Sequence, residues 1–160
     1  MSERFPPVID PRPLDVPWSH AVWPVPEDTV LRGNAVELRC TRVSDAAALA
    51  NALDDERVWE FAIMGKMTAD EWAERIEFLR SLPNFCQWTV VLREDLRGLA
   101  AETVVGTTAY LETSAGDART EIGFTMYNPT VWASSVNPEC KLLLLEHAFS
   151  HLNMGRVQLL

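Results

Sequence analysis

The segment Asn137–Leu152 (NPECKLLLLEHAFSHL) has the strongest helix pattern in the sequence and constrains the fold more than any other segment. Its apolar residues recur every three or four positions, which is typical of a helix packed against a core. Asn137 is expected to cap the helix, and Pro138 suits the first helical position, where no backbone N–H is needed. Glu139 favours the positive end of the helix dipole, and Gly155 is expected to follow the end of the helix.

The segments on either side of this helix are predicted to be strands. Arg119–Tyr127 alternates between polar and apolar residues, and Arg156–Leu160 is predominantly apolar. Two strands joined through a helix pair in parallel, with a right-handed crossover. The helix then begins at the carboxyl ends of the strands, where its free N–H groups attract anions. The sequence therefore predicts an anion-binding loop at Asn128–Val136.

The remaining pattern predicts an antiparallel sheet with helices before it. Thr68 and Glu71 have the spacing of a capping box, and Ser44 is expected to cap an earlier helix. Gly106 is a candidate for a bulge in the sheet. The expected elements, in order, are a strand Val36–Arg42, helices Ser44–Asp55, Asp54–Ile63 and Thr68–Leu82, and strands Phe85–Arg93 and Thr103–Glu112.

Residues 1–34 are predicted to form an extended N-terminal arm, because they contain seven of the ten prolines. The arm carries Trp18 and Trp23, large aromatic side chains that rarely stay in water. We therefore expect part of it to pack across the domain or onto a second subunit. Residues 35–160 are expected to form one domain.

The net charge of −9 argues against a nucleic-acid partner, because phosphate contacts need clustered Lys and Arg. No apolar run is long enough to span a bilayer, and the N-terminus lacks the pattern of a secretory signal, so a cytoplasmic protein is expected. Cys40, Cys86 and Cys140 have no metal-binding spacing and are expected to be packing residues. The alternative for Cys140 is a reactive thiol activated by the helix start.

The order of the elements and two segments of the sequence resemble the GNAT acetyltransferases. The segments are VVGTTAYLE (104–112) and EIGFTMYNPTVWASSVNPECKLLLLEHAF (121–149), the latter followed by GRVQL. The resemblance covers Val36–Leu160 and is closest to the RimJ/RimL-like group, which acetylates protein N-termini. It implies an α+β fold with a mixed, mostly antiparallel sheet, acetyl-CoA as co-substrate, no metal, and an amine acceptor such as a protein N-terminus.

The resemblance also implies which residues hold the cofactor. The strand residues that pair with the pantetheine arm are Thr125, Met126 and Tyr127. The loop residues that bind the pyrophosphate are Trp132, Ala133, Ser134, Ser135, Val136 and Asn137. Relatives have glycines where this chain has Ala133 and Ser135. If such a glycine has a positive φ, a side chain there costs about 1 kcal/mol or more. Two alternatives to normal cofactor binding follow. The loop binds coenzyme A more weakly, or it binds no ligand.

Transfer to an amine requires a base that removes its proton. Glu121 is the first candidate, acting directly or through water, and Tyr127 is a weaker catalytic candidate. The alternative for Glu121 is a solvated or paired carboxylate. His20, His147 and His151 are not clustered, and His147 is expected to be a packing or surface residue.

Family members continue beyond the strand that corresponds to Arg156–Leu160, so the fold is expected to be truncated after strand five. An exposed edge on that strand would favour a homodimer. Two alternatives to an active enzyme follow: a catalytically weakened acyl-CoA-binding protein, and a dimeric interaction module.

Overall fold

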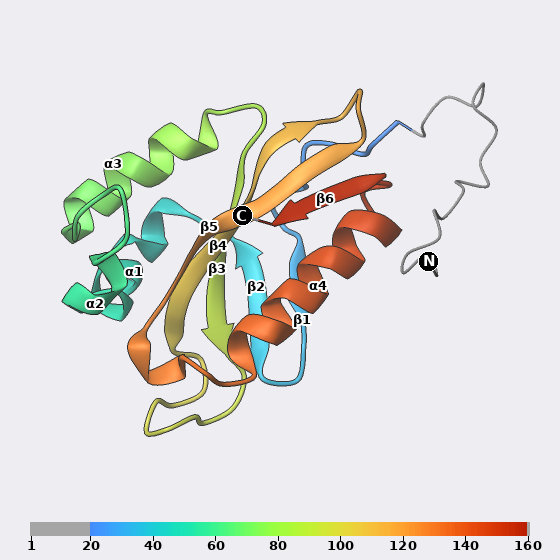
Figure 1. Cartoon of the computed structure of the whole chain (residues 1–160). Helices are drawn as coiled ribbons and strands as arrows, with labels where there is room; N and C mark the ends of the chain where they lie inside the picture. The colour runs from blue at the N-terminus through green and yellow to red at the C-terminus, as the bar shows by residue number, and fades with distance from the viewer. Residues whose placement is uncertain (1–19, 160) are drawn as a thin grey trace, which may run out of the picture.

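The computed structural model describes residues 20–159, which form a single six-stranded sheet with helices on both faces (Figure 1). Trp18, five of the arm's prolines and Leu160 lie outside the described residues. The strands lie side by side in chain order: β1 (Val30–Arg32), β2 (Val36–Cys40), β3 (Cys86–Leu92), β4 (Val104–Ser114), β5 (Arg119–Tyr127) and β6 (Arg156–Leu159). Neighbours from β1 to β5 are antiparallel, and β6 is parallel to β5, which confirms the predicted crossover.

The prediction of a fold truncated after strand five is wrong, because the sheet has six strands. The additional strand is β1, which the sequence analysis placed in the extended arm. Its three residues pair with β2, where Leu31 lies opposite Leu38. Trp23 also packs against the domain, with its ring 6.4 Å from that of Tyr110. The division of the chain at residue 34 stays a prediction.

The helices divide between the two faces of the sheet (Figure 1). They are the 3-10 turns η1 (Val43–Asp45) and η2 (Pro129–Val131) and the helices α1 (Ala46–Ala52), α2 (Glu56–Trp59), α3 (Ala69–Arg80) and α4 (Val136–Ser150). One core lies under α4 and includes Leu38, Trp88 and Leu144. A second lies among α1, α2 and α3 and includes Trp72 and Ile76. None of the helices in residues 20–159 is long and apolar enough to cross a membrane.

The start of α3 confirms the predicted capping box. The Thr68 N–H donates to the Glu71 carboxylate at 2.7 Å, and the Glu71 N–H donates to Thr68 Oγ1 at 3.3 Å. The predicted cap at Ser44 is wrong. The neighbouring Asp45 accepts from the Arg42 N–H at 2.9 Å instead, because its carboxylate is held beside that turn by two hydrogen bonds from Arg39.

Helix α4 begins at Val136 rather than after Asn137, so the predicted cap is wrong. Ser134 Oγ accepts from the Val136 N–H at 3.3 Å, which satisfies the helix start before Asn137 is reached. Pro138 therefore lies within the first turn rather than at its first position, and its missing N–H still costs no helical hydrogen bond.

Glu139 binds the first turn of α4 to the turn between β1 and β2. Its carboxylate accepts from the backbone N–H groups of Asn34, Ala35 and Val36 at 2.7, 2.8 and 2.9 Å. A side chain at Gly33 would overlap this carboxylate, so Glu139 would have to shift away from the turn to admit one. Glu139 thus anchors the helix that carries the predicted anion-binding loop, a role beyond the dipole interaction predicted from sequence.

His147 and Cys140 are packing residues of the core under α4. His147 is buried between Trp88 and Tyr110, and burial together with the nearby His151 lowers its pKa to about 4. Burial raises the pKa of the Cys140 thiol to about 12, which opposes the alternative of a reactive thiol. The predicted bulge falls at Val105, next to Gly106, where β4 has one more residue than β3.

Candidate functional site

The first component of the site is an open edge on β5. Strand β6 pairs with Arg119–Ile122 only, so within residues 20–159 no strand covers Gly123–Tyr127 on that side. The backbone of β5 is kinked at this point. It has one more residue than β4 between Gly123 and Met126, and Phe124 takes the left-handed φ of 48°. Such bulges bend a strand and free part of its backbone from pairing.

A cavity of about 380 Å³ lies beside this edge, between β5 and the connection from α2 to α3. It is mostly apolar, and its lining residues are Ala62, Ile63, Met64, Arg75, Phe124, Thr125 and Met126. Thr125 is bound from two sides, because its Oγ1 lies 2.8 Å from Lys141 Nζ and 2.9 Å from Thr108 Oγ1. Burial of the Lys141 amine lowers its pKa. Helix α4 and the sheet thus both position Thr125 at the edge.

The predicted anion-binding loop lies at the start of α4, where Ala133 has a φ of 51°. Ala133 therefore takes the left-handed conformation that was considered above for the glycines of relatives, whereas Ser135 does not, with a φ of −68°. Among residues 20–159, the backbone N–H groups of Ala133, Ser134, Ser135 and Asn137 have no acceptor. Grouped N–H donors at a helix start form an anion-binding site.

Two arginines that the sequence analysis missed lie against this loop. The Arg97 guanidinium donates to the carbonyls of Thr130, Trp132 and Ala133 at 3.1, 2.8 and 3.3 Å. The Arg57 guanidinium lies 5.8 Å from the centre of the Trp132 ring. Arg97 adds positive charge beside the N–H groups, whereas the charge of Arg57 is paired with Asp55 at 2.7 Å. They come from distant parts of the chain, so no local pattern reveals them.

The loop and strand residues predicted from the resemblance meet where Trp132 Nε1 donates to the Tyr127 carbonyl at 2.9 Å. Trp132, Ala133, Ser135 and Asn137 are exposed, and Ser134 is half-buried. The Val136 side chain is buried, and its N–H is taken by Ser134, so it serves the helix rather than a ligand. Thr125 and Met126 line the cavity.

The two catalytic candidates differ in position. The Glu121 carboxylate packs against Gly123, at the beginning of the open edge, and Gln158 Nε2 lies 3.4 Å from it. The Tyr127 hydroxyl is buried in the core under α4 and has no hydrogen-bond partner among the described residues. Burial raises its pKa far above that of a free tyrosine, so this hydroxyl is unsuited to proton transfer.

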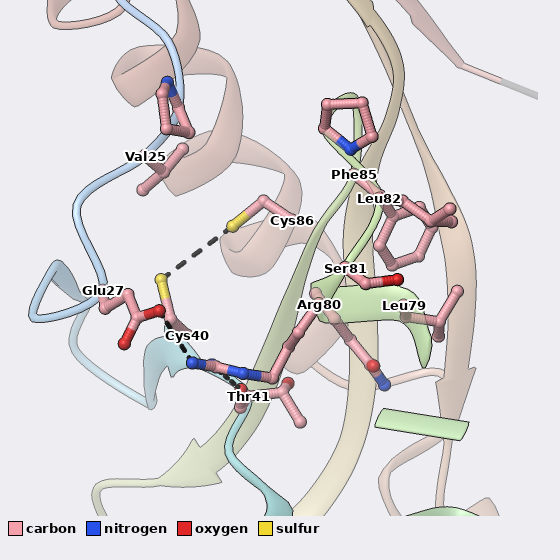
Figure 2. Close-up of a pocket in the computed structure, with 13 residues that line it drawn as sticks. Val25, Glu27, Cys40, Thr41, Leu79, Arg80, Ser81, Leu82, Phe85 and Cys86 are labelled. Atoms are coloured by element: carbon pink, nitrogen blue, oxygen red, sulfur yellow. Dashed lines mark hydrogen bonds and ion pairs between the residues drawn. The ribbon is translucent and has the colours of Figure 1, made fainter. Parts of the chain in front are cut away.

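A second cavity, of about 340 Å³, lies at the end of α3 and holds Cys40 and Cys86 (Figure 2). Figure 2 shows the two sulfurs facing each other, and they are 3.9 Å apart. The cation of this cavity is Arg80, and its guanidinium is already bound to the Glu27 carboxylate at 2.7 Å and to the Thr41 carbonyl at 2.9 Å. This cavity is not formed by β5 or α4 and is separate from the predicted loop.

The comparisons with known proteins identify the family. A family model described as an acetyltransferase (GNAT) domain matches residues 36–160, most of the chain. The chain belongs to the GNAT acetyltransferase family. Among curated proteins, no sequence matches it significantly.

Solved structures agree with this fold. A GNAT-family acetyltransferase from Chromobacterium violaceum has a TM-score of 0.79 at 23% identity, over 97% of this chain and 75% of that one. An acetyltransferase from T. thermophilus has a TM-score of 0.68 at 27% identity, over 86% and 68%. A structure from Vibrio cholerae named as a ribosomal-protein-serine acetyltransferase has a TM-score of 0.70 at 15% identity, over 84% and 75%.

The GNAT family consists of enzymes that transfer an acyl group from a coenzyme A thioester to an amine, and this chain is one of them. The alternative of a binding or interaction module is not favoured. No group of three or more potential metal ligands occurs in the part of the chain that the structure describes.

Proposed function

We propose that this chain transfers the acetyl group of acetyl-CoA to an amine, with the pyrophosphate bound by the loop Trp132–Asn137. The observation that carries the proposal is the group of N–H donors without acceptors at Ala133, Ser134, Ser135 and Asn137. The Arg97 guanidinium binds the carbonyls of the same loop. In this proposal the backbone N–H groups of the loop bind the ligand. We therefore expect the glycine-poor loop to bind the pyrophosphate through these N–H groups.

In this proposal the pantetheine arm lies along the open edge of β5. The backbone groups of this edge that point away from β4 supply its hydrogen bonds, as an added strand would receive them. The thioester then reaches the bulge at Phe124, beside the 380 Å³ cavity. The acceptor amine enters from the cavity. Tyr127 contributes through its backbone only.

The reaction forms a bond between the amine nitrogen and the acetyl carbon and breaks the carbon–sulfur bond. The sulfur leaves as a thiolate and takes up a proton, and the amine loses one. We propose that the Glu121 carboxylate is the base and accepts the proton of the amine through a water molecule. Glu121 and Gly123 lie two residues apart on β5, and the carboxylate packs against Gly123 at the edge.

For the acceptor we propose a protein N-terminal amine. The resemblance to the RimJ/RimL-like group supports this choice, as does the likeness in fold to the Vibrio cholerae structure. A homodimer, a cytoplasmic location and the absence of nucleic-acid and membrane partners stay predictions from the sequence. A dimer would form through the edge of β6, where Leu159 is 55% exposed.

Release of the coenzyme A thiol, measured with acetyl-CoA and a panel of amines and peptides, tests the proposal. Arg97→Ala is expected to raise the KM for acetyl-CoA about 10-fold, because it removes a charged donor from three loop carbonyls. Arg32→Ala is the control, since the exposed Arg32 pairs with the half-buried Glu37 of β2, outside the loop. No release above the blank with any acceptor would refute the proposed function.

A further inference from the structure

Arg75 is the charged residue of the cavity beside β5, and no residue within positions 20–159 forms an ion pair with it. It lies on α3, and its guanidinium carbon is 5.9 Å from the centre of the Phe124 ring. Its Nε is buried without a hydrogen bond, and no acidic residue in positions 20–159 forms an ion pair with it. Other arginines near it in sequence are paired, such as Arg57 with Asp55 and Arg80 with Glu27.

The acid best placed to pair with Arg75 along the helix is engaged elsewhere. Glu71 lies four residues earlier on α3, the spacing at which opposite charges meet. Its carboxylate is instead held by the N–H and the hydroxyl of Thr68, at 2.7 and 2.9 Å. The contact with Phe124 attracts the cation but satisfies none of its five N–H groups. Buried donors without partners are uncommon, and a ligand is one way to satisfy them.

The rest of the cavity favours an apolar group beside that charge. Met64, Phe124 and Met126 line it, and Ile63 at its wall is fully exposed. Phe61, in the same connection between α2 and α3, is 91% exposed. Large apolar side chains exposed at a cavity indicate a binding surface. Thr125 lines the same cavity and lies on the open edge of β5.

We propose that Arg75 binds a carboxylate of the acetyl acceptor, so that the acceptor is an amine with a nearby carboxylate and an apolar group. A guanidinium holds a carboxylate through two parallel hydrogen bonds, which would satisfy Arg75. This inference rests on the proposed function, because it places the amine at the β5 edge. The net charge of −9 does not oppose it, since exposed charges beyond about 10 Å are largely screened.

The carboxylate has two sources: the α-carboxylate of a free amino acid, or an Asp or Glu side chain near a peptide N-terminus. Thiol release with saturating acetyl-CoA distinguishes them. Leucine is compared with leucinamide, and Ala-Glu-amide with Ala-Gln-amide. Each pair exchanges a carboxylate for an amide, and the rates are compared per unprotonated amine, because the α-carboxylate of leucine also raises the pKa of its amine. The acid member of at least one pair is expected to have a kcat/KM about 10- to 100-fold higher, and the pair that shows the difference identifies the source.

Arg75→Gln is expected to remove that preference and to leave the neutral member of the pair and the KM for acetyl-CoA unchanged. Arg32→Gln is the matched control, because it lies on β1 in a surface pair with Glu37. A circular-dichroism melt of each variant checks folding. Equal rates within both pairs for the unaltered protein would overturn the inference while leaving the proposed function intact.

Binding without turnover provides a second test that does not depend on catalysis. N-acetyl-leucine and N-acetyl-glutamate amide are titrated against their neutral amide counterparts by calorimetry. Tighter binding of an acid that Arg75→Gln abolishes supports the inference, even if no thiol is released and the proposed function fails. Equal affinity of acid and amide in the unaltered protein would overturn it.

Discussion

Ala133 has a left-handed backbone conformation, with a φ of 51°, in the loop that we assign to the pyrophosphate. An L-residue with a side chain pays about 1–2 kcal/mol in this conformation, and glycine does not. Glycine loses more freedom on folding, which offsets about 0.4–1 kcal/mol of that gain. Ala133→Gly is therefore expected to raise the free energy of unfolding by about 0.5–1 kcal/mol.

The neighbouring Ser135 is the matched control. Its φ of −68° is ordinary for any residue, so Ser135→Gly gains nothing and loses about a few tenths of a kcal/mol at the helix start. Thermal unfolding measures both variants. For a domain of this size, Ala133→Gly is expected to raise the Tm by about 1–4 °C and Ser135→Gly to leave it unchanged or lower. A lower Tm for Ala133→Gly would refute the assigned backbone conformation.

Two further predictions concern α4. Glu139→Gln replaces a carboxylate that accepts three backbone hydrogen bonds, and we expect it to lower the free energy of unfolding by about 1–3 kcal/mol in urea denaturation. The exposed Glu146→Gln is its control, and equal effects would contradict the anchoring role. His147 has its folded pKa lowered to about 4, so its neutral form is favoured by the fold. The contribution of His147 to the free energy of unfolding is present above about pH 6.5. It is lost as the pH falls towards 4, and the loss is at most about 3 kcal/mol. Between pH 6.5 and 4, the His147→Phe variant is expected to lose less free energy of unfolding than the unaltered protein. Equal losses in the two proteins would contradict the lowered pKa of His147.

The periodic elements were predictable from sequence because their signals are local. The alternation of Arg119–Tyr127 and the stripe of Trp72, Ile76 and Leu79 on α3 required only the nearest residues. Helix α4 was found, but its start was misplaced, since Asn137 and Ser134 are both able to satisfy the first turn and only the folded loop decides between them.

Strand β1 was missed for a different reason. Its three residues are too few for a pattern, and its stability comes from pairing with β2 and from the turn that Glu139 binds. The Glu139 contacts join segments about a hundred residues apart and leave no local trace in the sequence.

The loop of the candidate site was predictable, and the residues that support it were not. Resemblance located Trp132–Asn137 and raised the question of a positive φ at Ala133, which the structure answers. Arg97, Lys141 and Arg75 reach the site through tertiary contacts. For a single charged residue in a polar segment, a surface position is the ordinary expectation.

The central claim is that the loop Trp132–Asn137 and the open edge of β5 bind acetyl-CoA. The most direct measurement is the Tm of this chain with and without excess acetyl-CoA. A site filled at about 100 times its Kd adds about 2.7 kcal/mol, which is a rise of about 5–10 °C for a domain of this size. The account predicts a rise of that size, reduced in Arg97→Ala and retained in Arg32→Ala. A folded protein whose Tm does not change with acetyl-CoA would contradict it.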